Sequence, residues 1–247
     1  MFPYRDENPT VLTPIVMVAI VVANVAVWIL VQGLGTEPSL SRSVCELGLI
    51  PGEFLHRLPA GLSIPVSPGM ACVIGPSPTW YAPLTSMFLH GGWFHLIGNM
   101  WFLVVFGNNI EDAMGHGRFL VFYLLTGLAA AAAQMVASPA STAPMVGASG
   151  AISGVMGAYV ILYPLVRVHT LIFLGIFVTR VTLPAYVMLG YWFLLQILGG
   201  LPGMAESSPG GVAFWAHIGG FLAGALLIPF FKDPALVRRP RRSTDWS

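Results

Sequence analysis

Charge is scarce in this chain of 247 residues: Asp, Glu, Lys and Arg together make up 9% of it, and the formal net charge is +1. Ordinary soluble domains carry a charge on about a quarter of their residues, so the composition argues against that class. A nucleic-acid-binding protein needs a basic surface, which so small a net charge does not supply. We therefore expect no nucleic-acid partner.

Metal-binding patterns are lacking as well. Neither His90 nor His95 has a cysteine or carboxylate at ligand spacing, so an interfacial role or a role in a polar site is favoured over zinc, and we expect no metal and no cofactor. Charges are absent from the middle of the apolar segments, and no internal repeat is visible. Both absences argue against a transporter or channel.

Apolar residues, by contrast, make up 56% of the chain, and the mean hydropathy is +0.78. A membrane core of about 30 Å is crossed by about 20 apolar residues in a helix, and by somewhat fewer where the bilayer thins. Six segments qualify: 11–31, 93–110, 119–137, 149–166, 183–198 and 212–231. Because lipid offers no partner for open strand edges, we predict an all-α membrane protein, a six-helix bundle in one domain spanning residues 1–247.

The basic residues predict an orientation, since Lys and Arg accumulate in short cytoplasmic loops. With the N-terminus inside, all but two of the eleven Lys and Arg residues lie inside. The exceptions, Arg42 and Arg57, fall in the long outer loop 32–92, where length weakens the rule. We expect a multi-pass protein of the cell membrane whose residues 1–10 and basic tail 232–247 are cytoplasmic. Residues 1–10 are too polar and long for a signal n-region, so segment 11–31 is expected to be retained.

This topology brings three polar side chains to one level. The segments that start at residues 93, 149 and 212 all run from outside to inside, so their first residues share the outer side of the membrane. His95 and Ser149 open the first two, and His217 lies about six residues into the third, or roughly 9 Å at the helical rise. The segment from Ser149 is short, so its start can lie below the surface and meet His217.

Ser149 and His217 have the chemistry of a nucleophile and its base, because a serine hydroxyl becomes reactive when a neutral imidazole takes its proton. A third, carboxylate member has no candidate: Glu111 and Asp112 lie at the cytoplasmic end of their segment. The sequence therefore predicts a dyad. Backbone N–H groups at the helix start beside Ser149 are suited to stabilising an oxyanion.

Each of these residues also has a plainer interpretation. Ser149 is a good helix N-cap, and Gly147 and Gly150 favour close helix packing. His217 is also compatible with a hydrogen bond to a backbone carbonyl inside the membrane, although ionisable groups at that depth are usually functional. The soluble lipase elbow is excluded, because Ala151 stands where its second glycine would be and no strand precedes the serine.

Several motifs occur in order along the chain. Residues 5–10 read Arg-Asp-Glu-Asn-Pro-Thr, and residues 90–99 contain His90, His95 and Asn99. They are followed by three further groups of residues: Gly107, Glu111 and Gly115; Gly147, Ala148, Ser149 and Gly150; and His217, Gly220 and Gly224. Together they resemble the bacterial members of the rhomboid family of intramembrane serine proteases.

The resemblance implies an endopeptidase that cuts transmembrane segments of membrane proteins near the outer face of the bilayer. Ser149 would be the nucleophile and His217 the general base, with His95, Asn99 and the backbone of Ala148 and Ser149 as oxyanion stabilisers. Asn99 stands four residues after His95, on the same helix face. The alternative is a catalytically inactive relative that binds and escorts membrane proteins, but such relatives usually lack the serine or the histidine.

The resemblance also implies that Gly220 and Gly224 let the last helix press against the helix of Ser149, as small residues do in membranes. Two features depart from the family pattern. Trp80-Tyr81 stands where many bacterial members have Trp-Arg to brace the outer loop, and Ser153 replaces an aromatic residue that stacks on the histidine. We expect Trp215, or packing alone, to hold the histidine instead.

Other expectations concern the surroundings of the site. Cys45 and Cys72 in the outer loop form a candidate disulfide on an oxidising face. Substrates should be single-span membrane proteins whose helices unwind easily, since a helix hides its carbonyls in hydrogen bonds. We expect them to enter between segments 93–110 and 183–198, beside Trp192 and Phe193, with the loop 199–211 as a gate. The apolar stretch 170–179 is predicted as an interfacial segment on the cytoplasmic surface.

Overall fold

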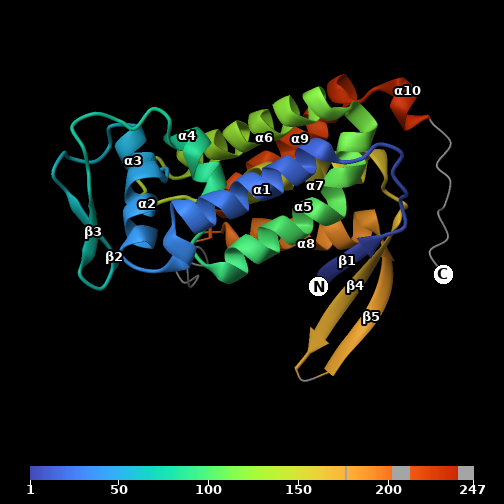
Figure 1. Ribbon diagram of the computed structural model, residues 1–247, viewed down its shortest axis with the longest axis horizontal. Helices are drawn as coiled ribbons and strands as arrows, with labels where there is room; N and C mark the ends of the chain where they lie inside the picture. The colour runs from blue at the N-terminus through green and yellow to red at the C-terminus, as the bar shows by residue number, and fades with distance from the viewer. Residues whose placement is uncertain (176, 202–211, 239–247) are drawn as a thin grey trace.

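The computed structural model describes residues 1–175, 177–201 and 212–238 and is built around a bundle of apolar helices (Figure 1). Each apolar segment expected from the sequence contains one long helix. The six helices are α1 (Ile15–Leu30), α5 (Trp93–Met114), α6 (His116–Ala137), α7 (Ser149–Leu162), α8 (Ala185–Gly199) and α9 (Phe214–Phe231). The predicted helical character of the segments is thus confirmed.

Within the described residues, two helices, α6 and α9, are long and apolar enough to cross a membrane alone. Helix α5 forms a third candidate span together with the short helices that precede it, across a bend of 91°. Helices α1, α7 and α8 are apolar but shorter. The count of six spans therefore stays a proposal.

Proline and glycine explain where the helices differ from the predicted segments. Helix α1 begins after Pro14 and α8 begins after Pro184, because proline fixes its own backbone and disfavours helix in the residue before it. Helix α7 ends at Leu162, before Pro164, and so is shorter than expected. Helix α5 continues to Met114 and stops at Gly115, whose φ of 78° is a conformation that favours glycine.

The all-α prediction is wrong, because five strands accompany the helices among the described residues. A three-stranded antiparallel sheet has the order β1 (Phe2–Asp6), β4 (Arg167–Leu174) and β5 (Phe177–Pro184). Residues 170–179, expected as an interfacial segment, form most of its hairpin, which projects from one end of the bundle (Figure 1). Lipid disfavours strands with open edges, but that restriction does not apply beyond the bundle end. The residues of β4 and β5 are largely β-branched or aromatic, as strands prefer.

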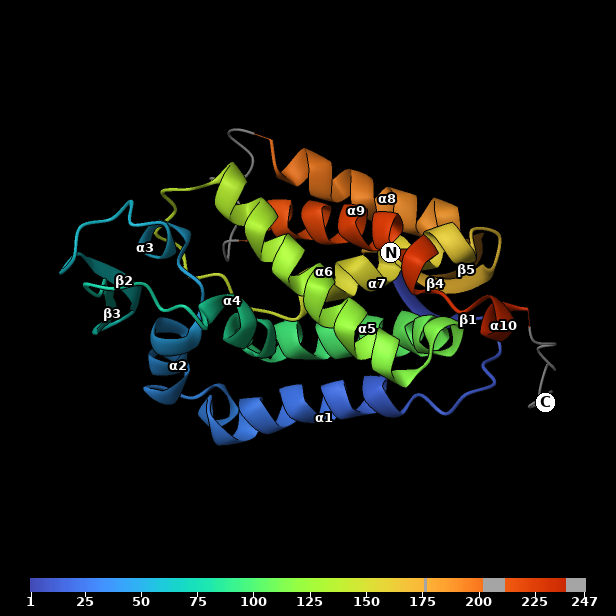
Figure 2. The ribbon, with the colours of Figure 1, turned by 90° about the horizontal axis from the view of Figure 1, so that it is seen from above.

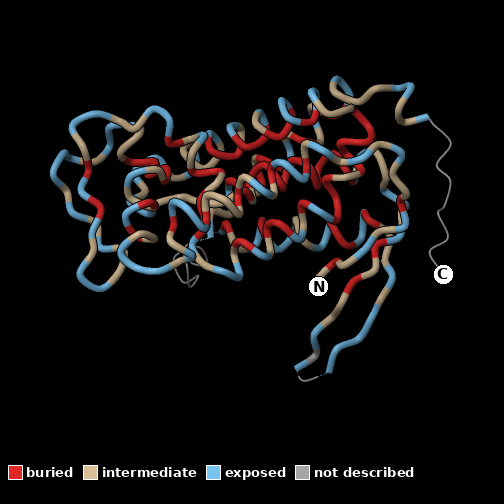
Figure 3. Tube along the Cα trace, in the orientation of Figure 1, coloured by how far each residue is buried: buried red, intermediate tan, exposed pale blue. Residues whose placement is uncertain are grey.

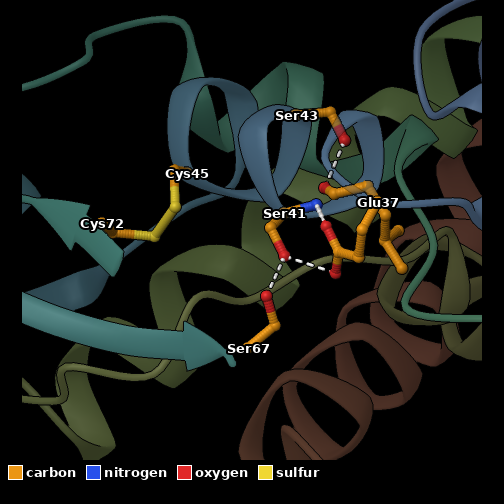
Figure 4. Close-up of a disulfide and its surroundings, with 7 residues drawn as sticks. Glu37, Ser41, Ser43, Cys45, Ser67 and Cys72 are labelled. Carbon is orange, nitrogen blue, oxygen red and sulfur yellow. Dashed lines mark hydrogen bonds between the residues drawn. A yellow bond between two sulfur atoms is a disulfide. The ribbon is translucent and has the colours of Figure 1, made fainter. Parts of the chain in front are cut away.

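The predicted outer loop 32–92 is a small folded unit. It contains η1 (Gly33–Gly35), α2 (Ser39–Leu47), α3 (Pro51–Phe54), the hairpin of β2 (Ser63–Ser67) and β3 (Met70–Val73), α4 (Ala82–Thr85) and η2 (Ser86–Phe88). A disulfide joins Cys45 of α2 to Cys72 of β3, with their Cα atoms 5.1 Å apart (Figure 4). Buried Ile50 and Ile74 pack beside Cys72 and give the unit an apolar core of its own.

Polar contacts also join α2 to the hairpin of β2 and β3 (Figure 4). The hydroxyl of Ser41 in α2 donates to Glu37 at 2.6 Å and lies 2.9 Å from the hydroxyl of Ser67 in β2. The bond from Ser41 lowers the pKa of Glu37. The unit is therefore held by a covalent link, apolar packing and a hydroxyl–carboxylate network.

Helix α7 lies in the middle of the bundle, where it packs against α5, α6, α8 and α9 (Figure 2). Buried residues follow the inner sides of these helices, whereas exposed residues predominate on the projecting hairpin (Figure 3). The contact between α7 and α9 is a backbone contact. A methyl group on Gly220 or Gly224 would overlap the carbonyl oxygen of Gly150 or Gly154, respectively. Small residues thus bring the helix of Ser149 against the helix of His217.

At the other end of α5, Glu111 and Asp112 hold the start of α1. The carboxylate of Glu111 accepts hydrogen bonds from the backbone N–H groups of Val16 and Met17, at 2.9 and 2.7 Å. Asp112 accepts two more from residues 11 and 12. These donors lie in and before the first turn of α1, where N–H groups lack partners within the helix. Glu111 therefore has a structural role far from Ser149.

Candidate active site

Ser149 is the first residue of α7, and the backbone before it makes a sharp turn. Gly147 has a φ of 125°, which only glycine adopts without strain, and its N–H donates to the carbonyl oxygen of Ser86 at 2.8 Å. The turn brings the serine hydroxyl to the mouth of α7. It also leaves the N–H groups of the first helical turn, with the positive end of the helix dipole, beside that hydroxyl.

His217 meets this serine from the first turn of α9. Its Nε2 atom lies 2.8 Å from Oγ of Ser149, although the two residues are 68 positions apart in the chain. Its other ring nitrogen, Nδ1, lies 2.8 Å from Oε1 of Gln196 in α8. The structure thus brings together the two residues expected from the sequence, with a third polar residue behind them.

Sequence reasoning missed Gln196, because the search for a third member considered only carboxylates. The sequence nevertheless contains a feature that points to Gln196: within residues 185–199 it is the one amide side chain in an otherwise apolar helix. A polar side chain in such a helix is usually held there by a partner or a function.

His95 and Asn99 approach the same place from α5. The N–H of Gly91 donates to Nδ1 of His95 at 3.2 Å, which leaves Nε2 facing Gly147. A Cβ atom built on Gly147 would lie 2.7 Å from that Nε2 atom and 3.5 Å from Oγ of Ser149. The side chain of Asn99 is 7% exposed, and among the described residues its Nδ2 donor has no hydrogen-bond partner. The ring of His95 thus lies beside the turn that carries Ser149, and Asn99 lines the same cavity.

A cavity of about 590 Å³ joins these groups. Its lining includes His95, Asn99, Gly147, Ser149, Trp192 and His217. It is large enough for several residues of an unwound peptide. Among the described residues, no group of three or more His, Cys, Asp or Glu side chains lies close enough to hold a metal.

The ring of His217 packs against the indole of Trp192. The two ring centroids are 5.8 Å apart with an angle of 41° between the planes. The sequence suggested Trp215 or packing alone for this role, whereas the indole described here comes from α8. Ser153, which stands in place of a stacking aromatic residue, donates its hydroxyl to the carbonyl oxygen of Ser149 at 2.6 Å. That bond is internal to α7.

The outer loop is braced by an amide rather than by the Trp80-Tyr81 pair. Gln32 donates to the carbonyl oxygen of His90 and accepts from its N–H, both at 2.8 Å. Trp80 is 80% exposed, and its indole contacts the ring of Tyr81 at 5.5 Å. The two hydrogen bonds to Gln32 fix the chain just ahead of α5, which carries His95.

The expected gate is described in part. Trp192 and Phe193 of α8 both stack on Phe221 of α9, with centroids 6.2 and 4.5 Å apart. Of the expected gate loop 199–211, residues 202–211 lie outside the described residues, as do residues 239–247 of the basic tail. The gate therefore stays a prediction.

These features define a helical membrane protein in which a serine and a histidine are paired at a largely apolar cavity that contains a few polar side chains. Residues 77–233 match the family model of the rhomboid domain. That match covers more than half of the chain, and the chain belongs to the rhomboid family. The resemblance expected from the sequence motifs is thus confirmed, and the family consists of membrane proteins.

Three relatives illustrate the likeness. The chain is 31% identical over 156 residues to Rhomboid-like protein 11, chloroplastic, of Arabidopsis thaliana, a match covering 61% of this chain and 52% of the relative. It is 34% identical over 157 residues to Rhomboid protease GluP of Bacillus subtilis (strain 168), covering 64% and 26%. It is 28% identical over 221 residues to RHOMBOID-like protein 4 of Arabidopsis thaliana, covering 84% and 50%. The matches therefore span from about a quarter to about half of these relatives' lengths.

Proposed function

We propose that this protein is an intramembrane serine endopeptidase that uses Ser149 as nucleophile and His217 as general base. The observation that carries the proposal is the distance of 2.8 Å between Oγ of Ser149 and Nε2 of His217, inside a bundle of apolar helices. Two such groups within hydrogen-bond reach, beside a cavity, form the arrangement that activates a serine for acyl transfer.

The reaction follows from that geometry. Oγ of Ser149 attacks the carbonyl carbon of the scissile peptide bond while Nε2 of His217 takes the hydroxyl proton. The C–N bond then breaks, and His217 gives the proton to the departing amine. A water molecule attacks the resulting ester with His217 again as base, which releases the second product and restores the hydroxyl of Ser149.

Charge develops on the carbonyl oxygen in this step and needs donors. The N–H groups of Ala148 and Ser149 at the start of α7, the side-chain amide of Asn99 and a ring nitrogen of His95 are the proposed set. The unpartnered Nδ2 atom of Asn99 supports it, because a buried donor without a protein partner is costly unless a ligand uses it.

We further propose that the substrates are single-span membrane proteins cut near the outer face of the bilayer. Residues in a stable helix have their carbonyls bonded, so segments with glycine, proline or other weak helix formers should be cleaved best. Six membrane spans, cytoplasmic termini and an outer position for residues 32–92 are part of this proposal. The disulfide between Cys45 and Cys72 supports the outer position, since disulfides persist in oxidising compartments.

The decisive experiment is cleavage of a single-span model substrate by purified protein in lipid vesicles. We expect the wild type to cut the substrate and Ser149→Ala and His217→Ala to lose activity by roughly 10³-fold or more. Equal thermal stability of the three proteins would exclude unfolding as the cause. Activity that persists in either variant would refute the role of that residue. Binding of substrates by the wild type without any cleavage would instead favour the escort function.

A further inference from the structure

We propose that Gln196 is a positioning residue that holds His217 in the tautomer required for catalysis. The inference rests on the proposed function, because it concerns how the base of the Ser149–His217 pair is oriented. A serine–histidine dyad lacks the carboxylate that orients the histidine in a triad, so its imidazole needs another fixed partner.

The amide of Gln196 is itself fixed in orientation. Its side chain is buried, its Oε1 atom lies 2.8 Å from Nδ1 of His217, and its Nε2 atom donates to the carbonyl oxygen of Trp192 at 3.3 Å. A carbonyl oxygen only accepts hydrogen bonds, so the amide nitrogen must face Trp192 and the amide oxygen must face the ring.

This orientation decides the protonation pattern of the ring. Because Oε1 of Gln196 has no proton to give, the hydrogen bond requires the proton to be on Nδ1 of His217. Nε2 then carries the lone pair, and it is this atom that lies 2.8 Å from Oγ of Ser149. Gln196 thus keeps the basic nitrogen directed at the nucleophile.

An amide suits this position better than a carboxylate would. Gln196 lies in an apolar helix, where an ionised group carries a large desolvation cost. A neutral amide provides the same directional acceptor without that cost. Trp192, on the same helix, packs against the ring at a tilt, so one helix supplies both contacts to His217.

Gln134 of α6 offers a matched control. Its Oε1 atom accepts a hydrogen bond from the N–H of Ala216 at 3.2 Å, one residue before His217. It therefore holds the same turn of α9 by the same kind of side chain. It bonds the backbone rather than the ring, so replacing it changes packing and polarity without altering the acceptor at Nδ1.

The test compares wild type, Gln196→Met, Gln196→Glu and Gln134→Met in two measurements. The first is the imidazole proton–nitrogen NMR spectrum of protein with ¹⁵N-labelled histidine, in which the His217 signals are assigned by their absence from His217→Asn. We expect the proton on Nδ1 in the wild type, a mixture of tautomers in Gln196→Met, and the wild-type pattern in Gln134→Met. Gln196→Glu keeps an oxygen opposite Nδ1, and at a pH at which the carboxylate is ionised it only accepts, so the wild-type tautomer should return there.

The second measurement is steady-state cleavage. We expect Gln196→Met to lower kcat by roughly 10- to 100-fold, the usual effect of removing a partner that orients a functional histidine, with KM unchanged. The proposal fails if Gln196→Met keeps both the wild-type spectrum and the wild-type kcat, or if Gln134→Met alters both to the same extent. If the wild type does not cleave any substrate, the spectra still decide the tautomer, so failure of the proposed function is told apart from failure of this inference.

Discussion

Helix α5 carries a polar cluster at each end, and the two clusters differ in how their atoms are bonded. His95 and Asn99 lie near its start, and Glu111 and Asp112 lie near its end. From His95 to Glu111 the distance along the helix is roughly 24 Å at a rise of 1.5 Å per residue. One helix therefore contributes to two separate polar sites within an apolar bundle.

At the end of α5, the carboxylates accept hydrogen bonds from four backbone N–H groups. At its start, Asn99 keeps a donor that has no partner among the described residues, and Asn99 is one of the residues that line the cavity of Ser149. Buried polar groups are usually bonded within the protein, so an unpartnered donor on a residue that lines the cavity is a candidate for binding a ligand. The comparison separates a structural cluster from a candidate catalytic one.

The largest effect on stability is expected from Glu111→Leu. The substitution leaves the N–H groups of Val16 and Met17 without their acceptor, and two such donors, one buried and one partly buried, cost about 3 kcal/mol. Unfolding in detergent would measure the loss, and cleavage by the folded fraction should stay at the wild-type level. Glu111→Gln keeps one acceptor oxygen and is the matched control. Equal stability of the leucine variant and the wild type would contradict a structural role.

Asn99→Ala should have the opposite signature. Removing one oxyanion donor lowers kcat by roughly 10²- to 10³-fold, while the melting temperature stays close to that of the wild type because the Nδ2 donor makes no hydrogen bond among the described residues. Asn24 provides the comparison, since its buried amide donates to the carbonyl oxygen of Ile20 at 2.8 Å. Asn24→Ala is expected to lower stability by about 1 kcal/mol and to leave kcat unchanged. A normal kcat in Asn99→Ala would remove it from the proposed oxyanion site.

A smaller effect is expected at the disulfide. The double variant Cys45→Ser with Cys72→Ser opens a loop of 27 positions and should destabilise the unit 32–92 by about 2 kcal/mol, at the lower end of the usual range. Limited proteolysis within β2 and β3 would detect the loosening. Cleavage should fall by less than about threefold, since Gln32 still holds His90 ahead of α5. Complete loss of activity would mean that the unit is part of the site.

The sequence predicted the bundle because a membrane restricts the choice of structure. Long apolar segments in lipid must be helical, and all six contain a helix. The errors lie where that restriction ends. The short apolar stretch 170–179 predicts an interfacial segment, but many residues of β4 and β5 are β-branched or aromatic, which favours strands. Strand β4 of the hairpin also pairs with β1, and such pairing between distant segments is not visible in a local pattern.

The sequence predicts those residues of the candidate site whose side chains are reactive. A nucleophile and a base are recognisable types, so Ser149 and His217 were expected together, and they lie within hydrogen-bond distance. Gln196 and Trp192 act on His217 by position rather than by reactivity. Their contacts depend on how α8 is rotated against α9, which hydropathy does not specify.

The smallest effect is expected at Ser153, which lies one helical turn after Ser149 in α7 and has no proposed role in catalysis. Its buried hydroxyl donates to the carbonyl oxygen of Ser149 within α7, a bond that satisfies the hydroxyl but adds little to a helix. Alanine is the better helix former, so Ser153→Ala should keep or slightly raise the melting temperature, with kcat within about twofold of the wild type. A large fall in kcat in Ser153→Ala would contradict the use of an unpartnered donor, such as that of Asn99, to recognise catalytic residues, because it would mean that a bonded residue near Ser149 is equally important. A normal kcat, beside an impaired Asn99→Ala, would support the distinction drawn between the two ends of α5.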